Sequence, residues 1–562
     1  MVLNISNNNF SSNQLKDLNT LGLDLVKDYN IVVDNYSKAY GSNHYFWSSE
    51  LPSRNSNDND IFKNIVFSTY IINLVTTNKK ITQIIVSDYS IYKVLKKNLK
   101  NYNIKIVLRT SHNKMLIIYL YPILKFFFNS YLLLKTFLIS RFTYLICDKK
   151  KIKDNLILVD TFIVKSSLNK NGFNDLYYKN FLGYFKNLNY YYLPSFVGIN
   201  NHYKTFMTLR KSEHKFFFKE DYLNFFDYIK AIFLPLKLLN FKPTNIFIRD
   251  IDFTTLFEDN WYKNLSSLSS MNSILNYFFI KQLKKNKIKI NCFLNWFENQ
   301  SCDKCYNLAL SKYYPKVFRS GFMVFFDSKF YTSLYPTQNE KNNNLLPNKI
   351  FTSSSLFANS IKEYCKDLKT GTITSFRNQF IWDFEKNNVK NKNFTILVTL
   401  SGVDVYRNDV LNLISQINSF NFLVKLHPAD NINSVKKSFK KKWPNNFNLV
   451  SSSLESIINK VDLLISSNST TILDSLSLGI PVIIIGGKFS LIQNPIPIQV
   501  PKSLFKVVYS KNELEKSLVY FKYKFRPKSK KIINDFKKTK NELNTKPSLE
   551  DFNNLININK KC

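Results

Sequence analysis

Several features are scarce in this chain of 562 residues, and each scarcity excludes a class of protein. The six cysteines are scattered, which excludes a disulfide scaffold and favours a reducing compartment. The pair Cys302 and Cys305 has CxxC spacing, but no second pair follows at the distance of a metal site. Residues 1–13 are polar and lack the apolar core of a signal peptide. We therefore expect a cytoplasmic protein.

Acidic residues are also scarce, at 40 against 79 lysines and arginines, which leaves a formal charge of +39. Such a charge is typical of nucleic-acid-binding proteins. However, the chain is rich in Lys, Asn, Ile, Phe and Tyr and has 11 glycines, a composition typical of an AT-rich genome. It contains no RNA-binding signature, no Cys/His finger spacing and no single basic helix. We therefore expect no nucleic-acid partner, although a basic surface favours acidic lipid headgroups and anionic donors.

Long uncharged apolar runs are absent, since none reaches the roughly 18 residues that a membrane span needs. The most apolar stretch, 115–146, is interrupted by a proline and by several basic residues. On a helix, Lys114, Lys125, Asn129 and Lys135 fall within one arc. This pattern fits an amphipathic helix that lies in the interface of an anionic membrane. A pair of helices buried inside the N-terminal domain fits it as well, and both interpretations stay open.

The clearest pattern in the chain is a strand, loop, helix and strand within residues 461–485. An apolar run, 461–465, ends in the hydroxyl-rich cluster 466–471, and an amphipathic run follows as far as Gly479. Such a pattern predicts a tight loop between a strand and a short helix. Backbone N–H groups and the helix dipole suit an anion such as a diphosphate at this place. An ordinary Ser/Thr helix cap is the alternative.

Two predicted strands upstream end in residues that extend this picture. The run 394–400 leads into Gly402, and the run 422–426 contains Lys425 and leads into His427. Alternating strands and helices at this spacing predict a parallel, doubly wound sheet, in which ligands bind outside the C-terminal ends of the strands. The candidate donor-binding residues are therefore Gly402, Lys425, His427, Ser467, Asn468, Ser469, Thr470 and Thr471.

The sequence KLHP followed by SSNSTTILDSLSLGIPVI resembles the nucleotide-binding half of GT-B glycosyltransferases. The most similar group makes capsular and other surface polysaccharides of the O-antigen type, and its relatives transfer polyol phosphates. The resemblance covers residues 394–500 and implies an α/β, GT-B-like fold with two Rossmann-like, doubly wound domains that face a cleft. It also implies that the His-Pro turn and the Ser/Thr loop hold the donor diphosphate. Asp474 then stands where the family, more often with Glu, holds the ribose.

In the N-terminal half, runs at 31–34, 84–87 and 104–108 predict strands, and runs at 62–75 and 90–100 predict helices. This alternation indicates a first Rossmann-like half. The segment around Trp47 and Arg54 resembles the N-terminal block of surface-carbohydrate glycosyltransferases, although Trp47 also suits a packing role.

A later run combines a strand at 288–294, Glu298, a helix at 304–312 and a strand at 317–325 that carries Gly321. It resembles the family pattern of an acidic residue before Asn-Gln, then a helix, then a strand with Gly. A carboxylate at this strand end can take a proton from an acceptor hydroxyl, so Glu298 is the catalytic candidate. An acid that interacts with the helix dipole is the alternative. The histidine that the family carries after the glycine is missing.

Asp34 and Asp404 are further candidates for the catalytic carboxylate, although either residue also suits a turn or a helix cap.

We therefore expect a glycosyltransferase that moves a sugar from a nucleotide-sugar to a lipid-linked or oligosaccharide acceptor in surface polysaccharide synthesis, including capsule or lipopolysaccharide. It works in the cytoplasm, peripherally on the inner face of the membrane. No DxD-type pair lies near the loop, so we expect neither an obligatory metal nor a cofactor besides the donor. A sugar-nucleotide 2-epimerase, a polyol-phosphate transferase and a catalytically inactive, membrane-associated scaffold are the alternatives.

The expected domains follow from these patterns. They are an N-terminal, acceptor-side domain (1–365) with an inserted apolar and aromatic region (114–285), an interdomain connection (366–393), a nucleotide-sugar-binding domain (394–525) and a basic tail (526–562).

Overall fold

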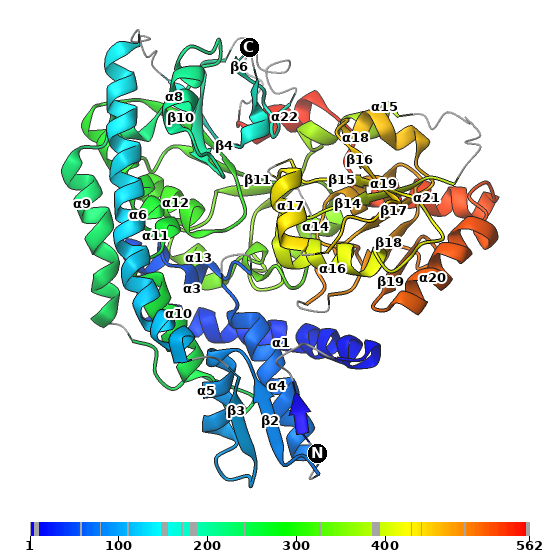
Figure 1. Cartoon of the computed structure of the whole chain (residues 1–562). Coiled ribbons are helices and arrows are strands. Elements are labelled where there is room, and N and C mark those ends of the chain that lie inside the picture. Colours follow the sequence, from blue (N-terminus) through cyan, green and yellow to red (C-terminus); the bar gives the residue numbers. More distant parts are fainter. Residues whose placement is uncertain are drawn as a thin grey trace.

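Two parallel six-stranded sheets organise the molecule (Figure 1). The computed structural model describes residues 2–4, 10–56, 59–78, 80–109, 112–147, 155–169, 172–179, 188–240, 242–324, 328–384, 394–428, 430–439, 441–487 and 491–557. The first sheet has the order β13 (Thr370–Thr372), β12 (Lys349–Thr352), β11 (Phe318–Met323), β10 (Ile290–Trp296), β4 (Leu156–Ile163), β7 (Tyr190–Phe196). The second has the order β16 (Phe447–Val450), β15 (Phe422–Lys425), β14 (Ile396–Thr399), β17 (Leu463–Ser466), β18 (Val482–Ile485), β19 (Phe505–Val508). The predicted fold class, two Rossmann-like α/β domains, is confirmed.

The second sheet follows the predicted strands closely because each is an apolar run between turn signals. Strands β14, β17 and β18 are buried along their whole length, as the strands of a parallel sheet covered on both faces must be. The predicted helix after the loop is α19 (Thr471–Ser477). It ends where Gly479 adopts a φ of +78°, a left-handed conformation that glycine accepts without strain.

The prediction of a strand at 31–34 is wrong. These residues belong to α1 (Ser12–Lys38), a helix of 27 residues that begins with a capping box between Ser11 and Gln14. The β-branched run there has a local preference for a strand. Nevertheless, the helix buries Val26, Tyr29 and Val33, which share one helical face at spacings of three and four residues. Burial of this face outweighs the local preference.

The first six-stranded sheet does not contain the strands predicted at 84–87 and 104–108. Strands β2 (Gln83–Val86) and β3 (Lys105–Leu108) form as predicted, but they pair with β1 (Val2–Asn4) in a separate three-stranded sheet. The six-stranded sheet begins at β4. Both β4 and β7 come from the region 114–285, so that region supplies two strands of the domain's main sheet. The connection 366–393 likewise contains β13, which pairs with β12.

The C-terminal ends of the two sheets face each other. Ser328, which follows β11, donates a hydrogen bond of 2.6 Å to the side chain of Gln493, which follows β18. Asn378, which follows β13, donates one of 2.8 Å to Asp474 on α19, which follows β17. Because each bond joins residues beyond the carboxyl end of a strand in either sheet, both edges open onto one interdomain cleft.

The C-terminal tail crosses from the second domain back to the first. Helix α21 (Lys530–Leu543) packs beside α19, and Asn544 next to it donates a hydrogen bond of 2.8 Å to Ser477. The backbone of Thr545 then donates to the carbonyl of Ser353, which follows β12. Helix α22 (Leu549–Leu555) ends on the first sheet, where Phe552 stacks on Phe376 with ring centroids 4.9 Å apart. The tail thus fastens the two domains to each other.

The apolar stretch 115–146 forms one long helix, α6 (His112–Ile146), which runs along one side of the first domain (Figure 1). Pro122 lies inside it without ending it. The interpretation as a pair of buried helices is therefore wrong.

Candidate functional site

The hydroxyl-rich loop between β17 and α19 is held in shape by its own side chains. Thr399, at the end of β14, lies 2.9 Å from the hydroxyl oxygens of both Ser466 and Thr471. Ser469 lies 2.8 Å from Thr471 and also accepts a hydrogen bond from its backbone N–H. The N-cap residue, Thr470, makes no capping bond through its side chain. The hydroxyls therefore tie the loop to the neighbouring strand.

The loop presents a partly exposed rim to the cleft. Asn468, Ser469 and Thr470 are partly exposed, whereas Ser467 is buried. Helix α19 has only seven residues, so its dipole acts mainly within the first turn. Any contribution to anion binding here would therefore come chiefly from local backbone and hydroxyl donors.

His427 and Gly402 lie against each other beside this loop. Their strands, β15 and β14, are neighbours in the sheet, and β17 lies on the other side of β14. A Cβ atom built on Gly402 would approach His427 Nδ1 to 2.9 Å, closer than real Cβ atoms come. The imidazole is exposed. Glycine at position 402 thus leaves the space that His427 occupies at the cleft.

Lys425 points elsewhere. Its Nζ donates a hydrogen bond of 2.6 Å to the carbonyl oxygen of Ser452, in the loop after β16. Because β16 lies beyond β15 from β14, the ammonium is directed away from the 467–471 loop. Burial lowers its pKa from the ordinary lysine value. The structure therefore brings His427, Gly402 and the loop together, but leaves the Lys425 ammonium on the far side of β15.

Asp474 lies on the first turn of α19, and its side chain is largely buried. Its carboxylate accepts the hydrogen bond from Asn378 of the other domain. The predicted ribose ligand is thus also a tie between the donor-side helix and the segment after β13.

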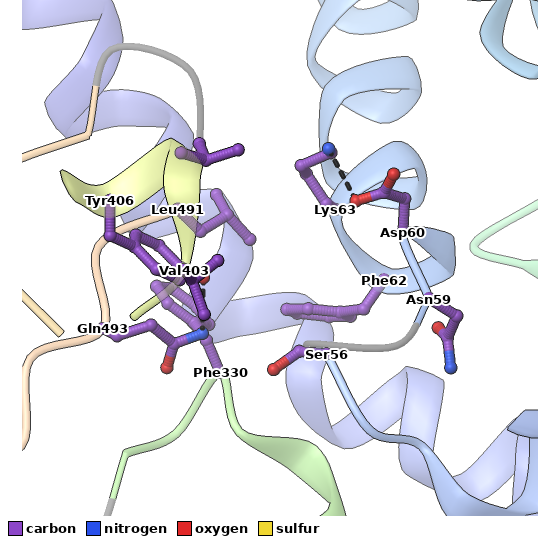
Figure 2. Close-up of a pocket in the computed structure, with 11 residues that line it drawn as sticks. Ser56, Asn59, Asp60, Phe62, Lys63, Phe330, Val403, Tyr406, Leu491 and Gln493 are labelled. Atoms are coloured by element: carbon purple, nitrogen blue, oxygen red, sulfur yellow. Dashed lines mark hydrogen bonds and ion pairs between the residues drawn. The ribbon is translucent and has the colours of Figure 1, made fainter. Parts of the chain in front are cut away.

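A small cavity of about 140 Å³ opens between the domains next to this site (Figure 2). Val403, the neighbour of Gly402, lines it together with Tyr406, Leu491 and Gln493 from the second domain. The first domain contributes side chains from the start of α4 (Ile61–Thr77) and the segments beside it, namely Ser56, Asn59, Asp60, Phe62, Lys63 and Phe330. An ion pair of 2.7 Å joins Asp60 and Lys63 at its wall. Polar and aromatic groups from both domains therefore converge beside Gly402.

Glu298 lies at the C-terminal end of β10, on the first domain's edge of the cleft. Its carboxylate accepts hydrogen bonds from the Trp296 indole (3.1 Å), the Gln300 amide (2.6 Å) and the Tyr331 hydroxyl (3.3 Å). Burial, and then the negative charge of Asp303, raises its pKa to about 7. The three hydrogen bonds act in the opposite direction. A carboxyl group with this pKa exchanges a proton near neutral pH.

Asp303 bears on the alternative role of Glu298, that of an acid that interacts with the helix dipole. Asp303 caps α12 (Ser301–Tyr313) by accepting hydrogen bonds from the backbone of Glu298 (3.1 Å) and Gln300 (2.9 Å). The amide of Asn295 donates both to Asp303 and to Asp160 on β4. Burial and the charge of Asp303 raise the pKa of Asp160. Asp303 thus supplies the capping-box carboxylate of α12, whereas the three hydrogen bonds described for the Glu298 carboxylate come from side chains.

The turn that carries Glu298 rests on a buried ionic network. Asn299 adopts a φ of +55° and donates a hydrogen bond of 3.1 Å to Glu340. Glu340 also pairs with Arg54 at 2.8 Å and with Lys304 at 3.0 Å, and all three charged side chains are buried. Lys304 in turn donates to the carbonyl of Asn299. These partners lie as far as 286 residues apart in the chain, so no local sequence signal indicates them.

The remaining candidates all lie in helices. Asp404 pairs with Arg407 one turn later on α16 (Asp404–Ile414), and Asp34 lies within α1. Trp47 is buried and donates to the Gly41 carbonyl, which confirms the packing role. Cys302 and Cys305 are free thiols in α12. Across the described residues, no group of three or more His, Cys, Asp or Glu side chains could hold a metal ion.

Close packing explains the glycine at position 321, which precedes the place where the resembled family carries a histidine. A Cβ atom there would lie 2.8 Å from Pro347 and 3.2 Å from Phe297. Phe322, which takes the place after it, is buried among the aromatic side chains of the first sheet.

Comparison with known proteins gives likenesses of fold. No family model matches the sequence, and no curated protein matches it. Among solved structures, the UDP-GlcNAc 2-epimerase of Methanocaldococcus jannaschii is 12% identical, with 72% of this chain and 100% of that chain covered and a TM-score of 0.40. The wall teichoic acid polymerase TagF is 10% identical, with coverage of 80% and 98% and a TM-score of 0.38. The trehalose 6-phosphate synthase of Burkholderia multivorans is 6% identical, with coverage of 69% and 94% and a TM-score of 0.38. At these values the likenesses assign no activity to this chain.

Proposed function

We propose that the protein is a glycosyltransferase that moves a sugar from a nucleotide-sugar to a lipid-linked or oligosaccharide acceptor in surface polysaccharide synthesis. The observation that carries the proposal is the opposition of two strand ends across one cleft. His427, Gly402 and the 467–471 loop lie at one edge, and Glu298 with its raised pKa lies at the other. Parallel sheets bind ligands at this edge.

The donor side would stabilise the leaving nucleoside diphosphate. Negative charge grows on the diphosphate as the glycosidic bond breaks, so donors fixed in advance lower the barrier. The imidazole of His427, which lies against Gly402, and the rim of the loop would supply such donors. Because Thr399 and Thr471 brace the loop, its donors keep their positions during the reaction. In this proposal the charge is met by the chain's own groups, without an obligatory metal.

The acceptor side would supply the base. Glu298, in its ionised form, takes the proton of the acceptor hydroxyl as that oxygen attacks the sugar. Its pKa of about 7 leaves a substantial ionised fraction at neutral pH and a strong enough base to accept the proton. Asp303 raises that pKa, and Glu340, through Asn299, holds the turn. The surface polysaccharide acceptor follows from the resemblance of the 425–428 and 466–483 segments.

A thermal-shift screen of nucleotide-sugars and free nucleoside diphosphates tests the donor site, because a ligand of the folded state raises its stability by RT ln(1 + [L]/Kd), or about 2.7 kcal/mol at 100 times Kd. We expect one nucleotide-sugar to raise Tm and to be turned over with a glycan acceptor. If a nucleotide-sugar binds but is turned over neither with acceptors nor alone, the result indicates the catalytically inactive scaffold. Conversion of the donor alone to a sugar epimer indicates the 2-epimerase. No stabilisation by any nucleotide overturns the proposal.

A further inference from the structure

Helix α6 buries polar side chains beside apolar ones and exposes an apolar stripe, whereas a helix on the surface of a soluble domain usually exposes its polar side. Its buried side includes the polar residues Asn129, Ser140 and Thr143. Asn129 donates a hydrogen bond of 2.8 Å to the Ser266 carbonyl, and Arg210 donates one of 3.1 Å to the Ser140 hydroxyl. The buried polar side chains Asn129 and Ser140 therefore form hydrogen bonds within the domain.

The outward side of α6 is apolar. Leu124, Phe127, Phe128, Tyr131, Leu138 and Phe142 are each more than half exposed. At 100° per residue they fall within an arc of about 100°, which makes one stripe along the helix, and exposed Lys135 lies within the same arc. Single exposed apolar residues are ordinary, but a continuous stripe of aromatic and aliphatic side chains marks an interaction surface.

The helix is held flat against the domain. Arg141 donates hydrogen bonds to the backbone carbonyls of Asp221 and Leu223, and Phe137 packs on Tyr228 with ring centroids 4.6 Å apart. The segment Leu120–Ile146 is long and apolar enough to cross a membrane, yet its attachments run along its length. It can therefore present its outward face to a surface but cannot span a bilayer without leaving the domain.

A neighbouring element widens the face. Helix α9 (Phe225–Phe233) runs beside α6 (Figure 1), and Phe233 lies 6.1 Å from Phe126 between ring centroids. Phe233 is exposed, as are Leu236 and Leu239 in the following turn η3 (Leu234–Asn240). We call the exposed apolar side chains of α6, α9 and η3 the apolar face.

The charges at this face have one sign. The sequences of α6, α9 and η3 contain a single acidic residue, Asp227, and its side chain is buried. Lys135, Lys230 and Lys237 are exposed. Lys135 extends over the Tyr131 ring, with Nζ 5.6 Å from its centroid. Lysines among exposed apolar side chains match a lipid bilayer, whose acyl region is apolar and whose headgroup layer can be anionic.

We propose that the apolar face docks the protein on an anionic lipid bilayer, with α6 lying in the interface parallel to the membrane plane. The aromatic and aliphatic side chains enter the acyl boundary, and the three lysines contact lipid phosphates. The buried arrangement of Asn129 corrects the sequence-based picture, in which it shared a headgroup-facing arc with Lys125 and Lys135. This inference goes beyond the proposed function, since the face forms a membrane contact whether or not the cleft transfers a sugar.

Vesicle flotation of the full chain tests the proposal. We expect it to float with phosphatidylcholine vesicles that contain phosphatidylglycerol, and less with phosphatidylcholine alone. High salt should weaken binding to the vesicles that contain phosphatidylglycerol without abolishing it, because salt screens the lysine charges and not the apolar contact. The double variant Phe127→Ser, Phe128→Ser should lower the membrane partition coefficient, measured from the floated fraction, by at least about tenfold. Phe126 is left unchanged because it packs against the core.

Two variants complete the design. Ile498→Ser with Leu549→Ser removes two apolar side chains outside the face, which are 91% and 61% exposed against 66% and 59% for Phe127 and Phe128, and should leave flotation unchanged. Lys135→Glu should lower flotation with anionic vesicles and leave binding to neutral ones unaltered. Equal loss in both double variants, or no flotation of the wild type, overturns the proposal.

Sedimentation without lipid distinguishes a second copy of the chain as the occupant. We expect a monomer; a dimer that Phe127→Ser, Phe128→Ser dissociates overturns the membrane proposal. Nucleotide-induced stabilisation of the same variant, measured by thermal shift, should equal that of the wild type. Loss of flotation with unchanged nucleotide binding thus separates this face from the cleft.

Discussion

The side-chain amide of Asn378 donates a hydrogen bond of 2.8 Å to the carboxylate of Asp474. The bond joins α19, which begins at the 467–471 loop, to the segment that follows the first domain's edge strand β13. Any ligand that moves α19 is thereby coupled to the other domain. It also gives Asp474 a structural role beside the proposed contact with ribose.

Asp474→Asn separates these two roles. If the carboxylate also holds ribose hydroxyls, the variant should lose more affinity for a nucleoside diphosphate than for pyrophosphate, by about 1.5–3 kcal/mol for a hydrogen bond to a charged group. Calorimetric titration with both ligands measures the difference. Asn378→Ala, which removes only the interdomain bond, should leave the ratio of the two affinities unchanged. Equal losses for both ligands in Asp474→Asn would restrict Asp474 to the tie.

His427→Ala should weaken binding of a nucleoside diphosphate by about 1.5–3 kcal/mol, with little effect on Tm because the imidazole is exposed. Gly402→Ala is the matched variant, since its new methyl group displaces the imidazole without removing it. We expect a similar loss of affinity. Titration calorimetry together with a thermal melt checks both, and unchanged affinity in both would take this corner out of the donor site.

The pH dependence of transfer should report Glu298. Because its pKa is raised to about 7, and because a base acts in its ionised form, kcat/KM should rise with pH through a limb near pH 7. Asp303→Asn removes a charge that raises this pKa, so the limb should move to lower pH. Tyr331→Phe removes a hydrogen bond that lowers it, so the limb should move to higher pH. Glu298→Gln should abolish both the activity and its pH dependence near pH 7. If Asp303→Asn and Tyr331→Phe shifted the limb of the pH profile in the same direction, Glu298 would be excluded as the titrating group.

Glu340→Gln should destabilise the first domain strongly. It leaves Arg54 and Lys304 as buried cations without a counter-charge, a change that typically costs about 3–5 kcal/mol. Denaturant unfolding measures it, with Glu363→Gln in the exposed pair with Lys329 as a control that should change little. A loss no larger than that of the control would contradict the assignment.

The same network predicts a loss of stability in acid. Burial raises the pKa of Glu340, but Arg54 and Lys304 outweigh burial, so the pKa lies below the ordinary value. The unfolded chain therefore takes up the proton first. The stability that the network contributes is complete above the ordinary glutamate pKa and is lost as pH falls through the lowered one. Unfolding free energies of wild type and Glu340→Gln should converge over that window.

The sequence by itself determined the second domain. Its strands, the loop at 467–471 and the glycine that ends α19 are marked by hydrophobic runs and turn residues within a few positions of one another. Such signals predict the observed elements because they depend on backbone geometry and local burial. The positions of Gly402, His427 and Glu298 at strand ends followed from the same patterns, since parallel strands collect their C-terminal ends at one edge.

Tertiary structure decided what depends on partners far along the chain. Because of tertiary packing, residues 31–34 are helical and β2 and β3 lie in a separate sheet. The Lys425 ammonium likewise points toward Ser452. Packing also turned Asn129 of α6 inward, where its side chain donates a hydrogen bond to a carbonyl 137 residues away. Periodicity reveals that a helix has two faces, but which face is buried depends on the neighbours that satisfy its polar groups, and those neighbours are brought together only by the fold.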